Sequence, residues 1–187
     1  PPPFAHIPVM AESVTEIFST VPSGPILDAT IGGGGHSLGI LESREDLNVI
    51  GIDQDPEALA AADSKLAGFA NRVSLIHGRF DDLSIVAKQI GNQKLSGFLF
   101  DLGVSSYQLD NPHRGFSFRN DGPLDMRMNP DSQITAERYV NEVTEDELAS
   151  LLSNYGDEKY SKRVARAIVS RRPILSTREL ADIICDA

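Results

Sequence analysis

The feature that most constrains the fold is a regular alternation of short apolar segments with helical patterns over the first hundred residues. Helical spacing or helix-start signals appear over residues 10–20 and near His36, Asp55 and Asp82. Strands that alternate with helices form βαβ units, in which the strands lie parallel. We therefore expect an α/β fold built on a parallel sheet. The predicted strands are residues 25–30, 48–53, 72–77 and 97–101.

The alternation stops after Asp101. Residues 103–131 form a long segment that is rich in Gly, Pro and Asp and also carries aromatic and arginine side chains. A connection of this length inside a compact domain is usually functional or disordered, and the aromatic side chains argue against plain disorder. We therefore expect this segment to take part in function.

The rest of the sequence predicts helices. They are expected over residues 144–154, over residues 157–171 and from Ser176 to the end, and capping boxes open the first and the last. We therefore predict a boundary near residue 110. The predicted domains are an α/β core over residues 1–110 and a loop with a helical domain over residues 111–187.

Composition excludes several classes of protein. Cys185 is the single cysteine and has no internal disulfide partner, which fits a reducing compartment and a cytoplasmic location. No apolar run approaches the ~18 residues of a transmembrane helix, and the first residues lack the pattern of a secretory signal. The four histidines are far apart and have no cysteine near them, so no metal site is predicted.

The charge of the chain is unevenly distributed. The net charge of −10 argues against a protein that coats nucleic acid non-specifically. Residues 159–172 (KYSKRVARAIVSRR) nevertheless hold six basic residues and no acid. Helical spacing places Lys159, Arg163 and Arg166 on one side, where they can bind phosphates. The alternative is an ordinary solvated helix face.

A run of glycines follows the first predicted strand. Residues 32–35 allow the backbone to approach a ligand closely, and the helix that follows presents free N–H groups. The carboxylate of Asp28 would repel a pyrophosphate but suits a cationic amino group. Asp53 closes the second strand, where a Rossmann-like fold places the acid that binds ribose hydroxyls. The pattern predicts binding of S-adenosyl-L-methionine (SAM), and the alternative is a structural turn.

Two more residues follow predicted strands. Asp101 ends the fourth strand, at the carboxyl edge of the sheet where ligands bind in this class of fold. Phe80 follows the third strand, where an aromatic ring packs either on adenine or in the core. We regard both as candidate site residues.

Five strings of residues occur in an order that resembles one family. By these strings the sequence is similar to the MraW/RsmH family of SAM-dependent methyltransferases, which methylate N4 of a cytidine in the decoding region of 16S ribosomal RNA. The resemblance covers nearly the whole chain, and RGFSF and GPLDMRM are its most specific strings. The strings are HIPVM (residues 6–10), DATIGGGGHS (28–37), DLGVSSYQLD (101–110), RGFSF (114–118) and GPLDMRM (122–128).

The resemblance implies a Rossmann-like methyltransferase core with a helical substrate-recognition insertion. It implies small-subunit ribosomal RNA or the 30S subunit as partner, no membrane association, and leaves a homodimer open. Because the family's chain continues further, we expect that the C-terminal strands of the core are missing from this sequence. The implied SAM contacts are Gly34, Gly35, His36, Asp53, Phe80, Asp101 and Gln108.

The implied substrate directs attention to aromatic and basic side chains. A target base must leave its stack to be methylated, and Tyr107, Phe116 and Phe118 are candidates to stack on it. Alternatively, the two phenylalanines anchor their loop to the core. Arg114 is a candidate phosphate contact, or it pairs with a neighbouring acid.

The same substrate requires a group that accepts a proton from N4. Asp101 or residues 103–106 would supply it, unless Asp101 serves the cofactor only.

Two other functions remain as alternatives. The first is a nicotinamide-dependent oxidoreductase, which Asp28 and the lack of a clean G-x-G-x-x-G disfavour. The second is a truncated module that binds RNA without catalysis.

Overall fold

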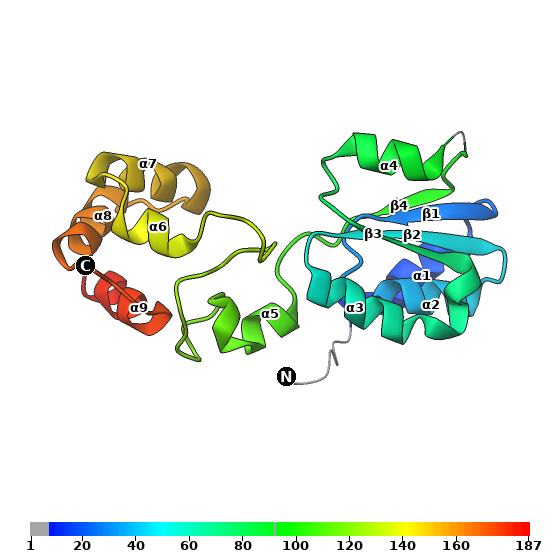
Figure 1. The fold of residues 1–187 in the computed structure, drawn as a ribbon, viewed down its shortest axis with the longest axis horizontal. Coiled ribbons are helices and arrows are strands. Elements are labelled where there is room, and N and C mark those ends of the chain that lie inside the picture. Colours follow the sequence, from blue (N-terminus) through cyan, green and yellow to red (C-terminus); the bar gives the residue numbers. More distant parts are fainter. Residues whose placement is uncertain (1–7, 92) are drawn as a thin grey trace. The chain divides into compact units, whose positions relative to one another are not determined.

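The computed structural model describes residues 8–91 and 93–187 and divides into two compact units, one that extends to Gly103 and one that begins at Val104. Figure 1 labels the elements of both units. His6 and Ile7 of the HIPVM string lie outside the described residues. The division falls before the boundary predicted near residue 110, because α5 (Ser106–Asp110) contacts the short 3-10 helix η2 (Pro112–Arg114) that follows it.

The first unit contains the predicted parallel sheet. Its order is β3-β2-β1-β4, and every pair is parallel. β1 therefore lies between β2 and β4. The chain adds β2 and β3 on one side of β1 and then crosses over to add β4 on the other side. Among the described strands, β4 pairs with β1 alone and forms an edge. The strands are β1 (Gly24–Asp28), β2 (Leu47–Asp53), β3 (Val73–His77) and β4 (Gly97–Leu99).

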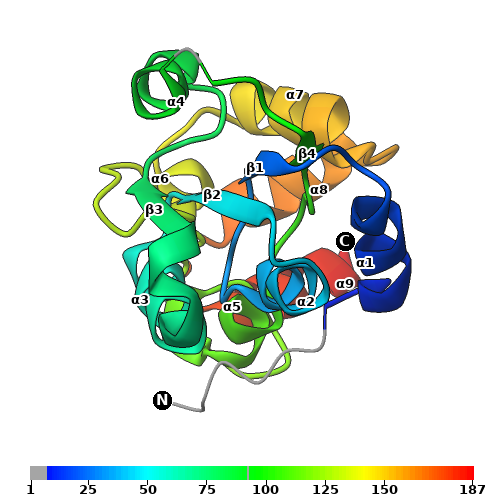
Figure 2. The same ribbon diagram turned by 90° about the vertical axis from the view of Figure 1, so that its right-hand side faces the viewer.

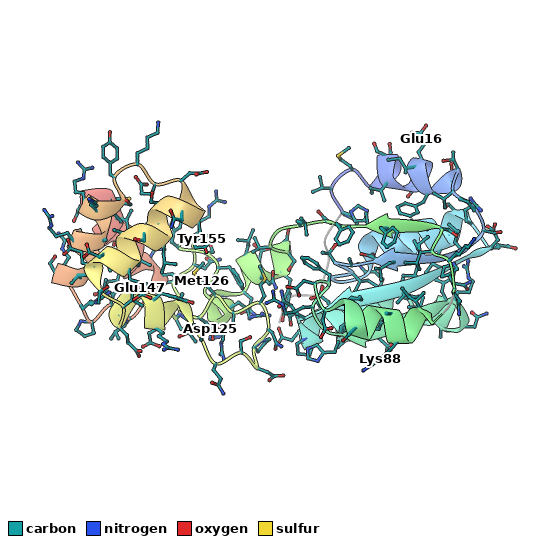
Figure 3. The ribbon with its side chains drawn as sticks, turned by 90° about the horizontal axis from the view of Figure 1, so that it is seen from above. Glu16, Lys88, Asp125, Met126, Glu147 and Tyr155 are labelled. Carbon is teal, nitrogen blue, oxygen red and sulfur yellow. The ribbon has the colours of Figure 1, made fainter. Side chains whose placement is uncertain are left out.

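Helices cover both faces of this sheet. Helices α1 (Ala11–Ser19), α2 (Gly35–Ser43) and α3 (Pro56–Lys65) lie on one face, and α4 (Leu83–Ile90) lies on the other (Figures 1 and 2). Exposed Glu16 on α1 and exposed Lys88 on α4 accordingly lie on opposite sides of this unit (Figure 3). These helices agree with the predicted ones.

Alternation along the strands supplies the two apolar cores. Ile26 of β1 packs with Phe18 and Ile40 on the face of α1 and α2. Its neighbour Leu27 packs with Ile50 on the opposite face. Successive strand side chains point to opposite faces, so a continuous apolar run is what a sheet covered on both faces requires.

The start of α3 follows from local chemistry. Asp55 is its N-cap, and Oδ1 of Asp55 accepts a hydrogen bond of 3.0 Å from the Glu57 N–H. Pro56 occupies the first helical position, where its missing N–H costs nothing. A short 3-10 helix, η1 (Ala67–Arg72), follows α3.

The second unit is helical and has a core of its own. Thr144 and Ser176 accept hydrogen bonds from Glu147 and Glu179 N–H, so both predicted N-caps form. The helix predicted from residue 157 begins later, because Asp157 adopts a left-handed conformation with φ of 50° and ends α7. The elements are α6 (Ala136–Asn141), which was not predicted, α7 (Glu145–Gly156), α8 (Ser161–Ser170) and α9 (Thr177–Asp186).

The long segment after Gly103 is anchored in this helical core. Leu124 is 2% exposed and packs with Val140, Leu148 and Ile174. Its neighbour Pro123 forms an isolated antiparallel bridge with Ser176. The segment is therefore ordered by burial. None of the described helices combines the length and apolar character needed to cross a bilayer.

We predict that Leu124→Ala lowers the free energy of unfolding by about 2–5 kcal/mol, because it leaves a cavity in a packed core. Leu175→Ala is the matched control, since Leu175 is 67% exposed. We expect the control to change stability by less than about 0.5 kcal/mol. Urea unfolding followed by circular dichroism measures both. Equal effects of the two substitutions would show that Leu124 does not anchor the segment.

Candidate functional site

Three aspartates lie at the carboxyl edge of the sheet. Asp28 ends β1, Asp53 ends β2, and Asp101 comes two residues after β4. In open α/β sheets, ligands bind outside the carboxyl ends of the strands where the strand order reverses. The reversal here lies between β1 and β4, so the edge predicted from the sequence is also the edge that the topology selects.

Asp28 has an internal role. It is 1% exposed, and its Oδ2 accepts a hydrogen bond of 2.7 Å from Oγ of Ser37 in α2. Its Oδ1 accepts a second bond, of 3.3 Å, from the Thr30 N–H. The prediction that Asp28 meets a cationic amino group is therefore wrong for this structure, because the carboxylate ties β1 to the start of α2.

Burial raises the pKa of Asp28 to about 6. Hydrogen bonds from Ser37 and Thr30 oppose this rise, whereas the charges of Asp53 and Asp101 add to it. The carboxylates at this edge therefore repel one another. A positive group at the edge would relieve the repulsion, and a pyrophosphate would increase it.

The glycine turn is fixed from the neighbouring strand. The Gly32 N–H donates a hydrogen bond of 2.9 Å to Oδ2 of Asp53, and Gly32 has a φ of 50°. A Cβ at Gly32 would meet only the Thr30 carbonyl oxygen, 3.9 Å away. The turn therefore has open space beside Gly32, which a ligand can use.

Gly34 and Gly35 serve close packing at the start of α2. Gly34 has a φ of 77°, and a Cβ there would lie 3.2 Å from Leu66. A Cβ at Gly35 would lie 2.5 Å from Cγ of Pro8. The first helical bond runs from the Leu38 N–H to the Gly34 carbonyl, so the amides before Leu38 face the helix end. Such amides bind anionic groups.

Asp53 is half-buried and uses both oxygens. Oδ2 accepts the bond from Gly32, and Oδ1 accepts one of 2.9 Å from the Asp55 N–H. Burial raises the pKa of Asp53, and these backbone bonds oppose the rise. A carboxylate oxygen has two lone pairs, so acceptor capacity remains for hydroxyl groups.

His36 and Asp101 lie beside each other. Nε2 of His36 is 3.6 Å from Oδ2 of Asp101, and the Asp101 side chain is 48% exposed. The Asp101 N–H donates a hydrogen bond of 2.7 Å to Oγ1 of Thr30, which fixes the backbone after β4. Nδ1 of His36 is buried and has no hydrogen-bond partner within the described ranges. Asp101 is thus an accessible carboxylate at this edge.

Phe80 lies outside the apolar cores described above. It is 40% exposed and packs edge-to-face on Phe100, with ring centroids 5.8 Å apart. An exposed ring is free to pack on a planar ligand, so contact with adenine stays a prediction.

Gln108 belongs to the second unit, where it is buried. Its Oε1 accepts a hydrogen bond of 3.0 Å from the Ser105 N–H, and Oγ of Ser105 accepts one of 3.2 Å from the Gln108 N–H. This reciprocal capping box opens α5. The pattern S-x-x-Q at residues 105–108 is the signal that sequence reasoning missed. A contact between Gln108 and a cofactor stays a prediction.

One of the candidate RNA contacts, Arg114, is buried and bound to the backbone of its own segment. Arg114 is 8% exposed, and its Nη2 donates hydrogen bonds to the carbonyls of Arg127 (3.0 Å) and Met128 (3.3 Å). Arg114 therefore holds its loop in this structure, and a contact between Arg114 and a phosphate stays a prediction.

The remaining RNA candidates differ in exposure. Phe118 is 63% exposed, whereas Phe116 and Tyr107 are half-buried. Arg166 lies 3.4 Å from Glu145, which offsets its charge. Lys159 and Arg163 are exposed. Lys159, Arg163 and Phe118 are thus the most accessible of the predicted contacts.

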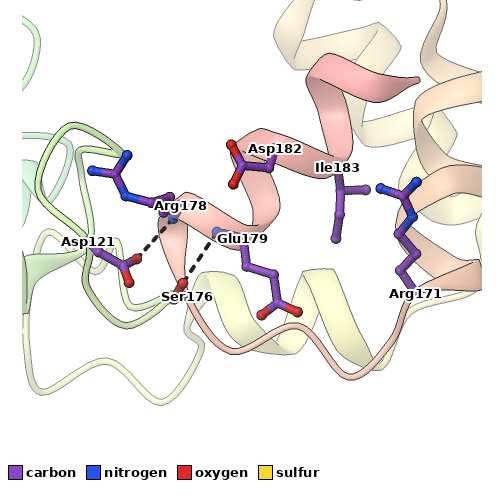
Figure 4. A pocket seen from close by; sticks show the side chains of 7 residues that line it. All are labelled: Asp121, Arg171, Ser176, Arg178, Glu179, Asp182 and Ile183. Carbon is purple, nitrogen blue, oxygen red and sulfur yellow. Dashed lines mark hydrogen bonds between the residues drawn. The ribbon is translucent and has the colours of Figure 1, made fainter.

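A hollow of about 410 Å³ lies in the second unit (Figure 4). Both signs of charge line it, and the Arg178 N–H donates to Oδ1 of Asp121 within it. No residue of the predicted site lines it. The lining residues are Asp121, Arg171, Ser176, Arg178, Glu179, Asp182 and Ile183.

Within residues 8–91 and 93–187, no three His, Cys, Asp or Glu side chains are grouped closely enough to hold a metal ion.

Known proteins resemble this chain over most of its length. The model of the MraW methylase family matches residues 3–187. Ribosomal RNA small subunit methyltransferase H of Heliobacterium modesticaldum is 50% identical over 186 residues, which cover 97% of this chain and 59% of that protein. The protein of the same name from Thermotoga neapolitana is 44% identical over 183 residues, 97% of this chain and 61% of that protein. The chain thus spans about three-fifths of the length of these relatives.

A solved structure is also similar. It is a putative rRNA methylase from Clostridium thermocellum, with a TM-score of 0.44 and 23% identity, and the match covers 51% of this chain and 52% of that one.

We predict that Asp28→Asn stabilises the protein at neutral pH relative to the wild type. Below pH 3.8, Asp28 is protonated in both the folded and the unfolded chain. As pH rises towards about 6, the unfolded chain loses this proton before the folded chain does, so the free energy of unfolding of the wild type falls. Above about pH 6 both states are ionised, and the free energy stays at the lower value. The full loss is on the order of 3 kcal/mol.

Urea unfolding of both proteins between pH 4 and 8 measures this difference in stability. The advantage of Asp28→Asn should grow up to about pH 6 and then level off. Asp63→Asn, on the exposed side of α3, is the control for loss of one carboxylate. An advantage that does not change with pH would contradict the prediction.

Proposed function

The chain belongs to the MraW methylase family, and from this premise we propose that it carries the cofactor-binding edge and the helical RNA-binding part of a cytoplasmic methyltransferase. The proposed reaction moves a methyl group from SAM to N4 of a cytidine in the decoding region of 16S ribosomal RNA. The observation that supports it most is the glycine turn held by Asp53 beside an accessible Asp101.

The residues at this edge fit SAM. When bound, SAM supplies a methyl group on a positively charged sulfur. We assign the ribose hydroxyls to Asp53 and the carboxylate of the cofactor to the first amides of α2. Asp101 takes the ammonium group in place of Asp28, because its carboxylate is exposed.

Electrostatics favour this cofactor over a nicotinamide dinucleotide. Asp53 and Asp101 both raise the pKa of Asp28 by their charges, so the edge already carries excess negative potential. A pyrophosphate adds two negative charges there, whereas a sulfonium and an ammonium are attracted. The oxidoreductase alternative is therefore disfavoured by the same carboxylates that support SAM.

The protein's contribution to catalysis is positioning and proton acceptance. The N4 lone pair is delocalised into the cytosine ring, so the amine is a weak nucleophile. Holding it in line with the methyl group can supply ~7–11 kcal/mol. Either Asp101 accepts the proton that N4 loses, or Asp101 serves the cofactor only. In the second case a carbonyl of residues 103–106 accepts a hydrogen bond from the N4 amine, and water takes the proton. His36, at 3.6 Å from Asp101, orients that carboxylate.

RNA contacts are assigned to the second unit. Lys159 and Arg163 offer exposed charges for phosphates, and Phe118 offers an exposed ring for a base. The partner is small-subunit ribosomal RNA, free or in the 30S subunit. Association of two copies of the chain stays a prediction.

We predict that this protein binds SAM and that Asp53→Asn weakens binding by on the order of tenfold to a hundredfold. The substitution removes the charge that strengthens two hydroxyl hydrogen bonds, each worth about 1.5–3 kcal/mol. Titration calorimetry measures the affinity, and Asp63→Asn is the matched control. NADH should give no binding heat. Equal affinity of Asp53→Asn and the wild type would remove Asp53 from the site.

The transfer reaction is tested separately with labelled SAM and either 16S RNA or 30S subunits. We expect label in the RNA and N4-methylcytidine after digestion to nucleosides. RNA binding without transfer, by a protein that binds SAM, would favour the non-catalytic RNA-binding module. Label in a different nucleoside would contradict the proposed target.

A further inference from the structure

The corner between α7 and α8 exposes two tyrosines. Tyr155, in the last turn of α7, is 86% exposed (Figure 3), and Tyr160, the N-cap of α8, is 62% exposed. Large aromatic rings are stabilised by burial, so two of them on one exposed turn need a reason. We call residues 155–163 the α7–α8 corner.

The corner is held by hydrogen bonds from its backbone N–H groups, and the tyrosine hydroxyls take no part in these bonds. The Glu158 N–H donates to the Leu152 carbonyl at 3.1 Å, and Oε1 of Glu158 accepts a bond of 2.7 Å from the Tyr160 N–H. Neither phenol hydroxyl has a hydrogen-bond partner within residues 8–91 and 93–187. The hydroxyl groups of the two tyrosines therefore do not hold the turn.

A cation lies on one of the rings. The guanidinium carbon of Arg163 is 4.8 Å from the centre of the Tyr160 ring. The guanidinium covers one face of the ring. Its N–H groups, which lie near the ring, can donate hydrogen bonds to an anion. Tyr160 and Arg163 thus combine a flat apolar surface with a positive charge.

Among the described residues, the cations of the corner have no acidic side chain within ion-pairing distance. Val164, Ala165 and Ile168 form the buried side of α8, so the helical spacing turns Lys162 and Arg163 outward. In the described part of the chain, no carboxylate lies within 4.0 Å of the charged groups of Lys159, Lys162 or Arg163. Arg166 differs, because Glu145 lies 3.4 Å away. The carboxylate of Glu158 is engaged by the Tyr160 N–H.

We propose that the α7–α8 corner binds single-stranded RNA, with a base stacked on Tyr160 and phosphates held by Lys159, Lys162 and Arg163. Exposed aromatic rings interleaved with cations are the chemistry that binds single strands, since every base has a flat face and every linkage has a charge. Tyr155 provides a second surface for stacking. The proposal rests on the proposed function, which supplies RNA as the substrate, and adds where the strand binds beyond the target nucleotide.

The first test measures the affinity for a labelled single-stranded RNA of about 12 nucleotides, a length within the range that one binding surface covers. Fluorescence anisotropy with the whole chain gives Kd. Tyr160→Ala should weaken binding about tenfold, whereas Tyr160→Phe should not, because stacking needs only the ring. Tyr139→Ala, at a tyrosine on α6 that is 41% exposed, is the matched control and should bind like the wild type.

The second test separates phosphate contacts from stacking. Replacing Lys159, Lys162 and Arg163 together by Gln should flatten the dependence of log Kd on log salt by about 0.7 for each lost contact. Arg171→Gln, at the end of the same helix and 3.3 Å from Asp186, should leave the slope unchanged. A duplex of the same RNA should bind more weakly, since its bases are already stacked.

The outcomes separate this proposal from the proposed function. The proposal for the corner is wrong if Tyr160→Ala binds the RNA with the Kd of the wild type. It is equally wrong if Tyr160→Ala and Tyr139→Ala have the same Kd, even where the protein binds SAM. Equal affinity for duplex and single strand would also contradict it. A protein that fails to bind SAM but still loses RNA affinity in Tyr160→Ala would overturn the cofactor assignment and leave the corner intact. Unfolding curves confirm that each variant is folded.

Discussion

The turn after β1 depends on carboxylates that the protein uses as acceptors for its own N–H and O–H groups. Asp28 fixes the start of α2 through Ser37, and Asp53 fixes Gly32 from the neighbouring strand. These hydrogen bonds therefore fix the turn in the absence of a ligand. The same arrangement places three acidic side chains at one edge, where they repel one another. That repulsion is the basis for the proposal that this edge binds a cationic ligand.

Local patterns could predict the first unit because its elements are defined by short-range features. The continuous apolar runs of β1 and β2 are visible in the sequence, and Asp55 with Pro56 marks the start of α3. The helix α6 has only six residues, too few to show a period. β4 ends at Leu99, two residues before the predicted end, because the Asp101 N–H bonds to a side chain of the β1–α2 turn.

The sequence predicts where the acidic side chains of the candidate site lie, but not which of them are buried. Strand ends placed Asp28, Asp53 and Asp101 at one edge, and nothing in one sequence says which of the three is buried. Asp28 accepts a hydrogen bond from Ser37, nine residues later, and Arg114 donates hydrogen bonds to carbonyls thirteen and fourteen residues later. These bonds keep both charged groups inside the protein. Partners at such separations are set by the fold, so a charged residue in a functional-looking segment can be structural.

The acidic edge also bears on the proposal that RNA binds at another surface. Three carboxylates repel phosphates, so this edge by itself does not attract a nucleic acid. At physiological salt the Debye length is about 8 Å, so the net charge of −10 acts weakly on a distant phosphate. At the α7–α8 corner, Lys159, Lys162 and Arg163 act at short range, because no carboxylate of the described residues lies within 4.0 Å of their charged groups. An acidic chain can therefore bind RNA through a small basic surface, provided that its cations stay free of ion pairs.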